Sequence, residues 1–149
     1  RQSGPTGATG PTGTVPDESF ASFINTQYPL VNGNPIIMFP DITDTTGNIT
    51  SPSVDRVTLA PGYYLVSYSV SGIFRTASYM QVTPSYNGTA HLETGVYFAT
   101  STNGSSACGS AHFIIYAPSQ TDFSLTFTGS SSATDGTLTL TFLKLRRGQ

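Results

Sequence analysis

Tyr63-Tyr64-Leu65-Val66-Ser67-Tyr68-Ser69-Val70-Ser71 is the stretch of this sequence that most directly determines its fold. The even positions from 64 to 70 are large, whereas serine fills the odd positions from 67 to 71. Only Tyr63 and Leu65 break the small, polar pattern of the odd positions. A period of two predicts a strand, here residues 63–74, that places one face on a core and the other outward.

Similar runs occur along most of the chain, separated by turn residues. Asn87-Gly88 is a hairpin signal between two of them. We find no convincing helical period, and about eight to ten short strands separated by turns are typical of a β-sandwich or barrel. Besides residues 63–74, the predicted strands cover residues 19–28, 35–39, 48–51, 56–59, 79–86, 89–100, 110–116, 122–128 and 137–145.

The composition of the 149 residues narrows the function. Hydrophobic residues make up 37% and charged residues only 9%, with a net charge of −2, so the surface is neutral and suited to subunit contacts. We find no basic patch with interleaved aromatics, so nucleic acid is not an expected partner. No apolar run reaches the roughly 18 residues that span a membrane, so no membrane insertion is expected. The single cysteine, Cys108, excludes a disulfide within the chain.

The first fourteen residues repeat glycine at every third position, at Gly4, Gly7, Gly10 and Gly13. Only glycine fits at the axis of a collagen triple helix. The prolines at positions 5 and 11 favour the backbone angles of that helix. We interpret residues 1–14 as the end of a longer collagen-like stalk and residues 15–149 as a separate head. The alternative is a flexible Gly/Pro linker.

Threonine ends each triplet, at Thr6, Thr9 and Thr12. These hydroxyls would point outward from a triple helix and are candidate sites of O-glycosylation. The alternative is that threonine is simply a soluble choice at these positions.

A triple helix requires three chains, so the stalk predicts a homotrimeric head. The last strand is apolar on both faces near its end, and its second apolar face needs another partner. The candidate trimer-interface residues are Tyr63, Tyr97, Tyr116, Leu143 and Leu145. The alternative is that some of them are core residues or isolated exposed apolar residues.

The triplets, the polar junction Val15-Pro16-Asp17-Glu18 and the all-β head together resemble the collagen-like spore-surface glycoproteins of the BclA type, from the exosporium of Bacillus and Clostridium relatives. The head of that family is similar to the tumour necrosis factor and complement one-q jelly roll. Residues 61–68 resemble its central Gly-x-Tyr strand, and residues 138–145 resemble its closing strand near the three-fold axis.

The resemblance implies an all-β jelly-roll sandwich of about ten antiparallel strands, tight trimerisation, a stalk glycosylated on threonine, and extracellular display on a spore or cell surface. An anchoring motif is not found in the sequence, so attachment to the spore exosporium rests on the resemblance.

Other candidate sites have ordinary explanations. Cys108 and His112 lie on one face of a strand and would suit a nucleophile pair, but a buried free thiol and a polar strand residue explain them as well. The aspartates Asp41, Asp44 and Asp55 lie in or near one loop. They could bind calcium, and the alternative is that they are ordinary solvated carboxylates. Three Asn-x-Ser/Thr patterns begin at Asn48, Asn87 and Asn103.

The sequence therefore predicts a structural, surface-display protein that is not an enzyme and needs no cofactor or metal. Its head would nucleate the stalk, form the tip of a filament and contact a host glycan or protein receptor. One alternative is the receptor- or carbohydrate-binding head of a phage or viral spike, since such spikes also join collagen-like shafts to jelly rolls. An enzyme with Cys108 as nucleophile is the remaining alternative.

Overall fold

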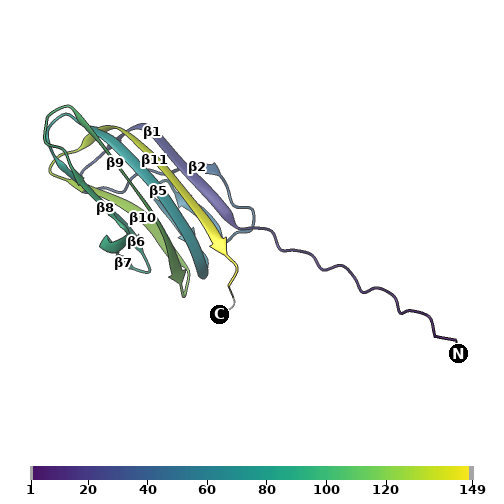
Figure 1. The fold of residues 1–149 in the computed structure, drawn as a ribbon. Coiled ribbons are helices and arrows are strands. Elements are labelled where there is room, and N and C mark those ends of the chain that lie inside the picture. Colours follow the sequence, from purple (N-terminus) through teal and green to yellow (C-terminus); the bar gives the residue numbers. More distant parts are fainter. Residues whose placement is uncertain (1, 148–149) are drawn as a thin grey trace.

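Alternating burial along the strands arranges the chain in two antiparallel sheets that pack face to face (Figure 1). The computed structural model describes residues 2–147. These residues form eleven strands and one 3-10 turn: β1 (Phe20–Leu30), β2 (Phe39–Ile42), β3 (Ile49–Ser53), β4 (Arg56–Leu59), β5 (Gly62–Phe74), β6 (Tyr79–Tyr86), β7 (Thr89–Ala90), η1 (Leu92–Thr94), β8 (Val96–Ala99), β9 (Ser105–Ala117), β10 (Thr121–Gly129) and β11 (Ala133–Leu145).

The topology brings the two ends of the head together. One sheet has the order β2-β1-β11-β5-β9, and the other has the order β3-β4-β10-β6-β7, with β8 also paired to β6. The first long strand, β1, pairs antiparallel with the last, β11, from Phe20 opposite Leu143 onward. Two antiparallel sheets connected in this way form a jelly-roll sandwich, which confirms the predicted fold class.

The core lies between the sheets and is built by the residues that the period-two pattern selects. Tyr64, Val66, Tyr68 and Val70 of β5 are all buried, as the sequence predicts. On β11, the ring of Phe142 meets the rings of Phe23 and Phe123 edge to face, with centroids 6.0 and 5.0 Å away. The contact with Phe123 of β10 joins the two sheets and helps to hold the layers together, whereas the contact with Phe23 of β1 lies within one sheet.

The predicted strands 110–116 and 137–145 begin earlier in the structure, as β9 and β11, and two other predicted strands differ in kind. The predicted run 89–100 is split into β7 and β8 by η1, where the Gly95 amide donates to the Leu92 carbonyl, although both pieces still pair with β6. The predicted run 35–39 is mostly irregular: Pro35, which has no N–H to donate, forms only an isolated bridge to Thr126, and the regular strand β2 begins at Phe39. Its residues Ile36 and Met38 are nevertheless buried in the core.

The predicted hairpin at Asn87-Gly88 is confirmed. Both residues have positive φ, 53° and 75°, which is the conformation that a tight two-residue turn between antiparallel strands requires.

Residues 2–18 are exposed and extend away from the head as a single chain (Figure 1). The C-terminal end of β11 lies beside the point where this segment joins the head. Within residues 2–147, no helix has the length and hydropathy needed to cross a membrane.

Candidate functional site

The outward face of the five-stranded sheet carries a continuous row of apolar side chains. Phe20 of β1 lies opposite Leu143 of β11, which lies opposite Leu65 of β5, which lies opposite Ile114 of β9. Phe20, Leu65 and Ile114 are 46%, 37% and 63% exposed. Four adjacent strands thus present large apolar groups to solvent at one level of the sheet.

A second row lies next to the first, toward the N-terminal segment. Leu145 lies opposite Tyr63, and Tyr63 lies opposite Tyr116. The two tyrosine rings stack with centroids 4.6 Å apart and planes 25° apart. The guanidinium carbon of Arg147 lies 4.9 Å from the Tyr63 ring centroid, a cation–π contact at the border of the row. We call these two rows the apolar band; it comprises Phe20, Tyr63, Leu65, Ile114, Tyr116, Leu143 and Leu145.

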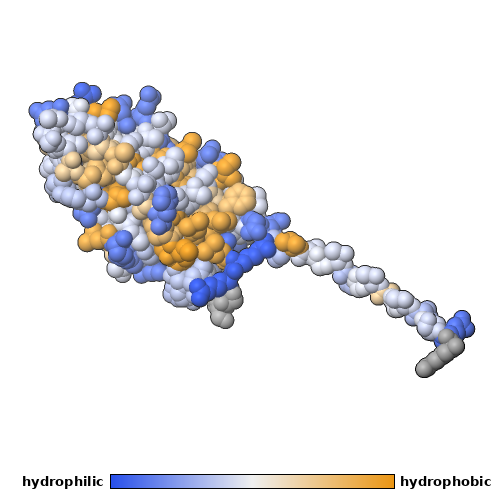
Figure 2. Space-filling view, in the orientation of Figure 1, coloured by the Kyte–Doolittle hydropathy of each residue, from blue (hydrophilic) through white to orange (hydrophobic). Residues whose placement is uncertain are grey.

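Beyond the apolar band, the central strands β5 and β11 carry small hydroxyl side chains on the same face, while Ile24 of β1 and Ile73 of β5 are separate exposed apolar residues. Ser67, Ser69 and Ser71 of β5 lie opposite threonines 141, 139 and 137 of β11. Figure 2 shows the resulting contrast, with the largest hydrophobic area toward the end of the head that carries the N-terminal segment. A contiguous exposed apolar patch bordered by neutral polar groups is typical of a protein–protein contact.

The predicted interface residues separate into two groups. Tyr63, Tyr116, Leu143 and Leu145 lie together in the apolar band. Tyr97 lies on β8 in the other sheet, 66% exposed, where its ring stacks on that of Tyr79 with centroids 6.0 Å apart.

Sequence reasoning missed Phe20, Leu65 and Ile114, which contribute much of the exposed area of the apolar band. For Leu65 and Ile114, the sequence did contain a sign that they face outward as apolar residues. Leu65 breaks the small, polar series on β5, and Ile114 stands between two other large residues, so both strands are apolar on both faces. The same criterion had singled out Leu143.

Cys108 and His112 lie on the same face of β9, as their even spacing predicts, but this face is exposed, so the interpretation of Cys108 as a buried thiol is wrong. Four residues of extended strand separate their Cα atoms by about 13 Å, so the thiol and the imidazole do not form a pair. The His112 Nδ1 atom instead lies 2.7 Å from Ser67 Oγ on the neighbouring strand. This arrangement gives no geometric support to a Cys/His nucleophile.

The three loop aspartates do not converge. Among residues 2–147, no three His, Cys, Asp or Glu side chains gather in a way that would hold a metal ion. Asp41 accepts a long hydrogen bond from Ser22 (3.4 Å), and Asp55 accepts one from Ser53.

Asp44 has a structural role in its loop. Its carboxylate accepts hydrogen bonds from Thr46 Oγ1 (2.8 Å) and from the Ile49 amide (3.0 Å). Burial raises the pKa of the Asp44 carboxyl, but the hydrogen bonds from Thr46, Ile49 and Asn48 outweigh burial and leave the pKa below its ordinary value.

The three asparagines of the Asn-x-Ser/Thr patterns all hydrogen-bond within the head. Asn48 Nδ2 donates to Ser19 Oγ (2.8 Å), Asn87 Nδ2 donates to the Tyr116 carbonyl (2.9 Å), and Asn103 Oδ1 accepts from the Ala77 amide (2.9 Å). These bonds give each asparagine a structural role.

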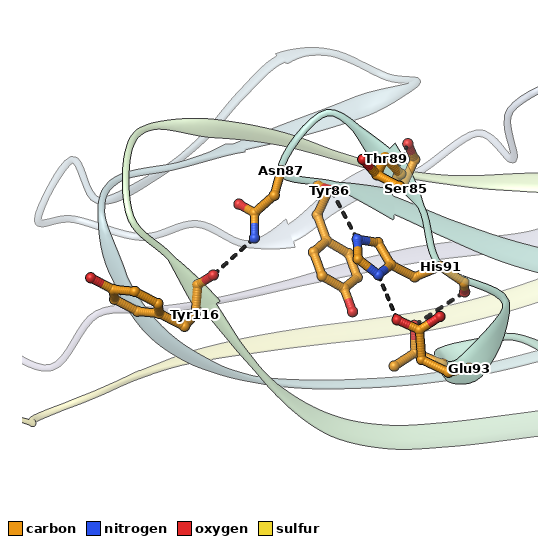
Figure 3. Close-up of polar contacts among 8 residues, drawn as sticks. Ser85, Tyr86, Asn87, Thr89, His91, Glu93 and Tyr116 are labelled. Carbon is orange, nitrogen blue, oxygen red and sulfur yellow. Dashed lines mark hydrogen bonds and ion pairs between the residues drawn. The ribbon is translucent and has the colours of Figure 1, made fainter.

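A polar cluster surrounds the β6–β7 turn (Figure 3). The His91 ring lies parallel to the Tyr86 ring at 3.7 Å, with His91 Nδ1 2.6 Å from the Glu93 carboxylate and Nε2 3.1 Å from the Tyr86 carbonyl. The hydrogen bond with His91 lowers the pKa of Glu93. Both ring nitrogens of His91 already lie within hydrogen-bond distance of oxygen atoms of the head. We therefore interpret this cluster as one that stabilises the β6–β7 hairpin.

The sequence matches no family model and no curated protein sequence. Among solved structures, the fold is similar to the globular domain of the zebrafish complement 1qA protein (TM-score 0.61, 9% identity, 89% of this chain and 100% of that one). It is also similar to murine APRIL (TM-score 0.58, 14% identity, 87% and 100%). The vertex protein P5 of PRD1 is a third similar structure (TM-score 0.54, 15% identity, 86% and 97%).

At these identities the likeness concerns the fold alone. It confirms the jelly roll of the tumour necrosis factor and complement one-q kind that the resemblance implied for the head. The spore-surface part of the resemblance stays a prediction.

The substitution Asp44→Asn should lower the free energy of unfolding near neutral pH by about 1 kcal/mol, a value discounted because the carboxylate is partly exposed. The folded-state pKa lies below the ordinary value of 3.8, so this stabilisation is present above that value and is lost as the pH falls through the folded-state pKa. Urea denaturation at several pH values should show that the difference in the free energy of unfolding between the wild type and Asp44→Asn decreases toward zero in acid. The exposed-carboxylate control Asp17→Asn should leave the profile unchanged, and an advantage that persists in strong acid would contradict this account.

Proposed function

We propose that this chain is the head and the adjoining stalk end of a homotrimeric, collagen-stalked surface protein with a structural rather than an enzymatic role. The observation that carries the proposal is the apolar band. A row of Phe20, Leu143, Leu65 and Ile114 across four strands is the kind of surface that an obligate interface buries. Removing it from water would stabilise an assembly by about 25 cal/mol for each Å² of apolar surface.

The stalk glycines support the same proposal. A Cβ atom added at Gly4, Gly7, Gly10 or Gly13 would meet nothing within 4 Å in the single chain, and none of the four has a positive φ. The isolated chain therefore contains no steric reason for glycine at every third position. A triple helix supplies that reason, because each glycine then lies at a crowded axis.

The position of the apolar band favours a head that nucleates the stalk. The band lies at the end of the sheet from which residues 2–18 leave, so trimerisation through it would bring three stalk ends together. Thr6, Thr9 and Thr12 are exposed and would be available to carry O-linked sugar. Display on a spore exosporium or another cell surface is the setting that the family resemblance suggests for such a protein.

The substitution Leu65→Arg tests the interface directly. It places a charge in the middle of the apolar band, so the solution mass measured by light scattering should fall from about 47 kDa, three chains, to that of one chain of 15.7 kDa. The matched control Ser124→Arg lies on the outward side of β10 in the other sheet and should leave the trimer intact. A monomeric wild type, or a trimer that tolerates Leu65→Arg, would show the proposal to be wrong.

A second candidate function is carbohydrate binding by the other sheet. Tyr79 and Tyr97 form an exposed stacked pair on β6 and β8, with Gln81 opposite Tyr97 and Thr128 opposite Gln81. Aromatic faces pack against the apolar faces of sugar rings, while amide and hydroxyl groups bond to their hydroxyls. This pair points away from the apolar band, so a trimer formed through the band would present three copies of it.

A glycan array probed with the full chain tests this second function. Tyr97→Ala should weaken binding to any neutral oligosaccharide hit by about tenfold, whereas Tyr28→Ala, an exposed tyrosine on the other sheet, should not. The mass of Tyr97→Ala should remain that of a trimer. The absence of any hit, or a Tyr97→Ala variant that is monomeric, would contradict a sugar platform here, and the latter would place Tyr97 in the interface.

A further inference from the structure

The junction between the N-terminal segment and the head is held by contacts from the end of β11 and from Arg146, which follows it. The Lys144 amide donates a hydrogen bond to the Ser19 carbonyl (2.8 Å), which extends the β1–β11 ladder by one step before Phe20. Together the two ends line an open cleft of about 510 Å³. The chain that leads to the stalk is therefore in contact with the last residues of the head.

Arg146 reaches beyond this step toward the stalk. Its Nη2 atom donates to the Pro16 carbonyl (2.8 Å) and to the Glu18 carboxylate (2.7 Å). The Arg146 guanidinium thus binds the junction at both Pro16 and Glu18. The bond to Glu18 joins two charged groups, and such a hydrogen bond is stronger than a neutral one. Pro16 adds stiffness, because its ring fixes φ.

Ser19 is the residue of the junction that is anchored in the head. It is 7% exposed, and its Oγ atom lies 2.7 Å from Thr46 Oγ1 and accepts a hydrogen bond from Asn48 Nδ2 (2.8 Å). Within the described chain, residues 2–15 make no hydrogen bond to the head. The direction in which the stalk leaves is therefore set between Pro16 and Ser19.

We propose that Arg146 is a positioning residue that fixes the exit direction of the stalk and, in the trimer, aligns the three stalk chains for triple-helix formation. This inference rests on the proposed trimeric function. Both members of the Arg146–Glu18 pair are about half exposed, at 51% and 53%, so the pair adds little to the stability of the head. Its effect should fall on the stalk, whose first turns otherwise have no contact that orients them.

Electron–electron distance measurement between spin labels tests this role in the full chain. A label at Val15→Cys, in a Cys108→Ser background, reports distances between the chains of one trimer just beyond the junction. The unmodified junction should give a narrow distance distribution. Arg146→Ala should about double its width, because residues 2–15 then behave as a flexible linker.

Matched variants separate positioning from stability. Glu18→Ala should broaden the distribution in the same way as Arg146→Ala, and the double variant should add little. Arg75→Ala, which removes an exposed cation from another loop, should leave the width unchanged. The solution mass and urea midpoint should be the same for all of these variants.

Two negative results have different meanings. Equal widths for Arg146→Ala and the unmodified junction, with interchain coupling present in both, would overturn the positioning role and leave the trimer standing. An absence of interchain coupling in the unmodified chain would overturn the proposed trimer, and this inference with it.

Discussion

The antiparallel pairing of β1 with β11 is the constraint on which the rest of the structure depends. It places the first and last strands of the head side by side in the middle of one sheet. Phe20 is thereby brought beside Leu143 to begin the apolar band, and Glu18 is brought within 2.7 Å of Arg146. The candidate interface, the N-terminal segment and its contacts with Arg146 therefore lie at one end of the molecule as a consequence of a single strand pairing.

The low charge of the chain gives the apolar band its significance. Only 9% of the residues are charged, and beyond the band the central strands β5 and β11 present rows of serine and threonine. Neutral hydroxyl groups have a small desolvation cost compared with charges, so a partner surface can approach the whole face. Affinity would then come from the band, and the hydroxyl rows would add hydrogen bonds or hold water. The proposed homotrimer would satisfy these conditions and would also supply the three chains that a collagen-like reading of the glycine period requires.

The sequence predicted well what depends on local pattern, and less well what depends on which strands become neighbours. The alternation in residues 63–74 identified β5 and its buried residues, and Asn87-Gly88 identified a hairpin. Rows across the sheet depend on register, so Phe20 and Ile114 gave no sign of lying at one level with Leu65. The same limit explains why Tyr97 was grouped with residues of the other sheet. The contact between Glu18 and Arg146 spans 128 positions, so no local pattern reveals it.

Photocrosslinking from the apolar band would test the central claim most directly. A photoreactive phenylalanine analogue at Ile114, 63% exposed in the single chain, would lie against a second copy if the band is an interface between subunits. Irradiation should then give covalent dimers and trimers on a denaturing gel, while the same analogue at Ser124 in the other sheet should give none. A chain that remains monomeric on the gel after efficient activation at position 114 would contradict the account.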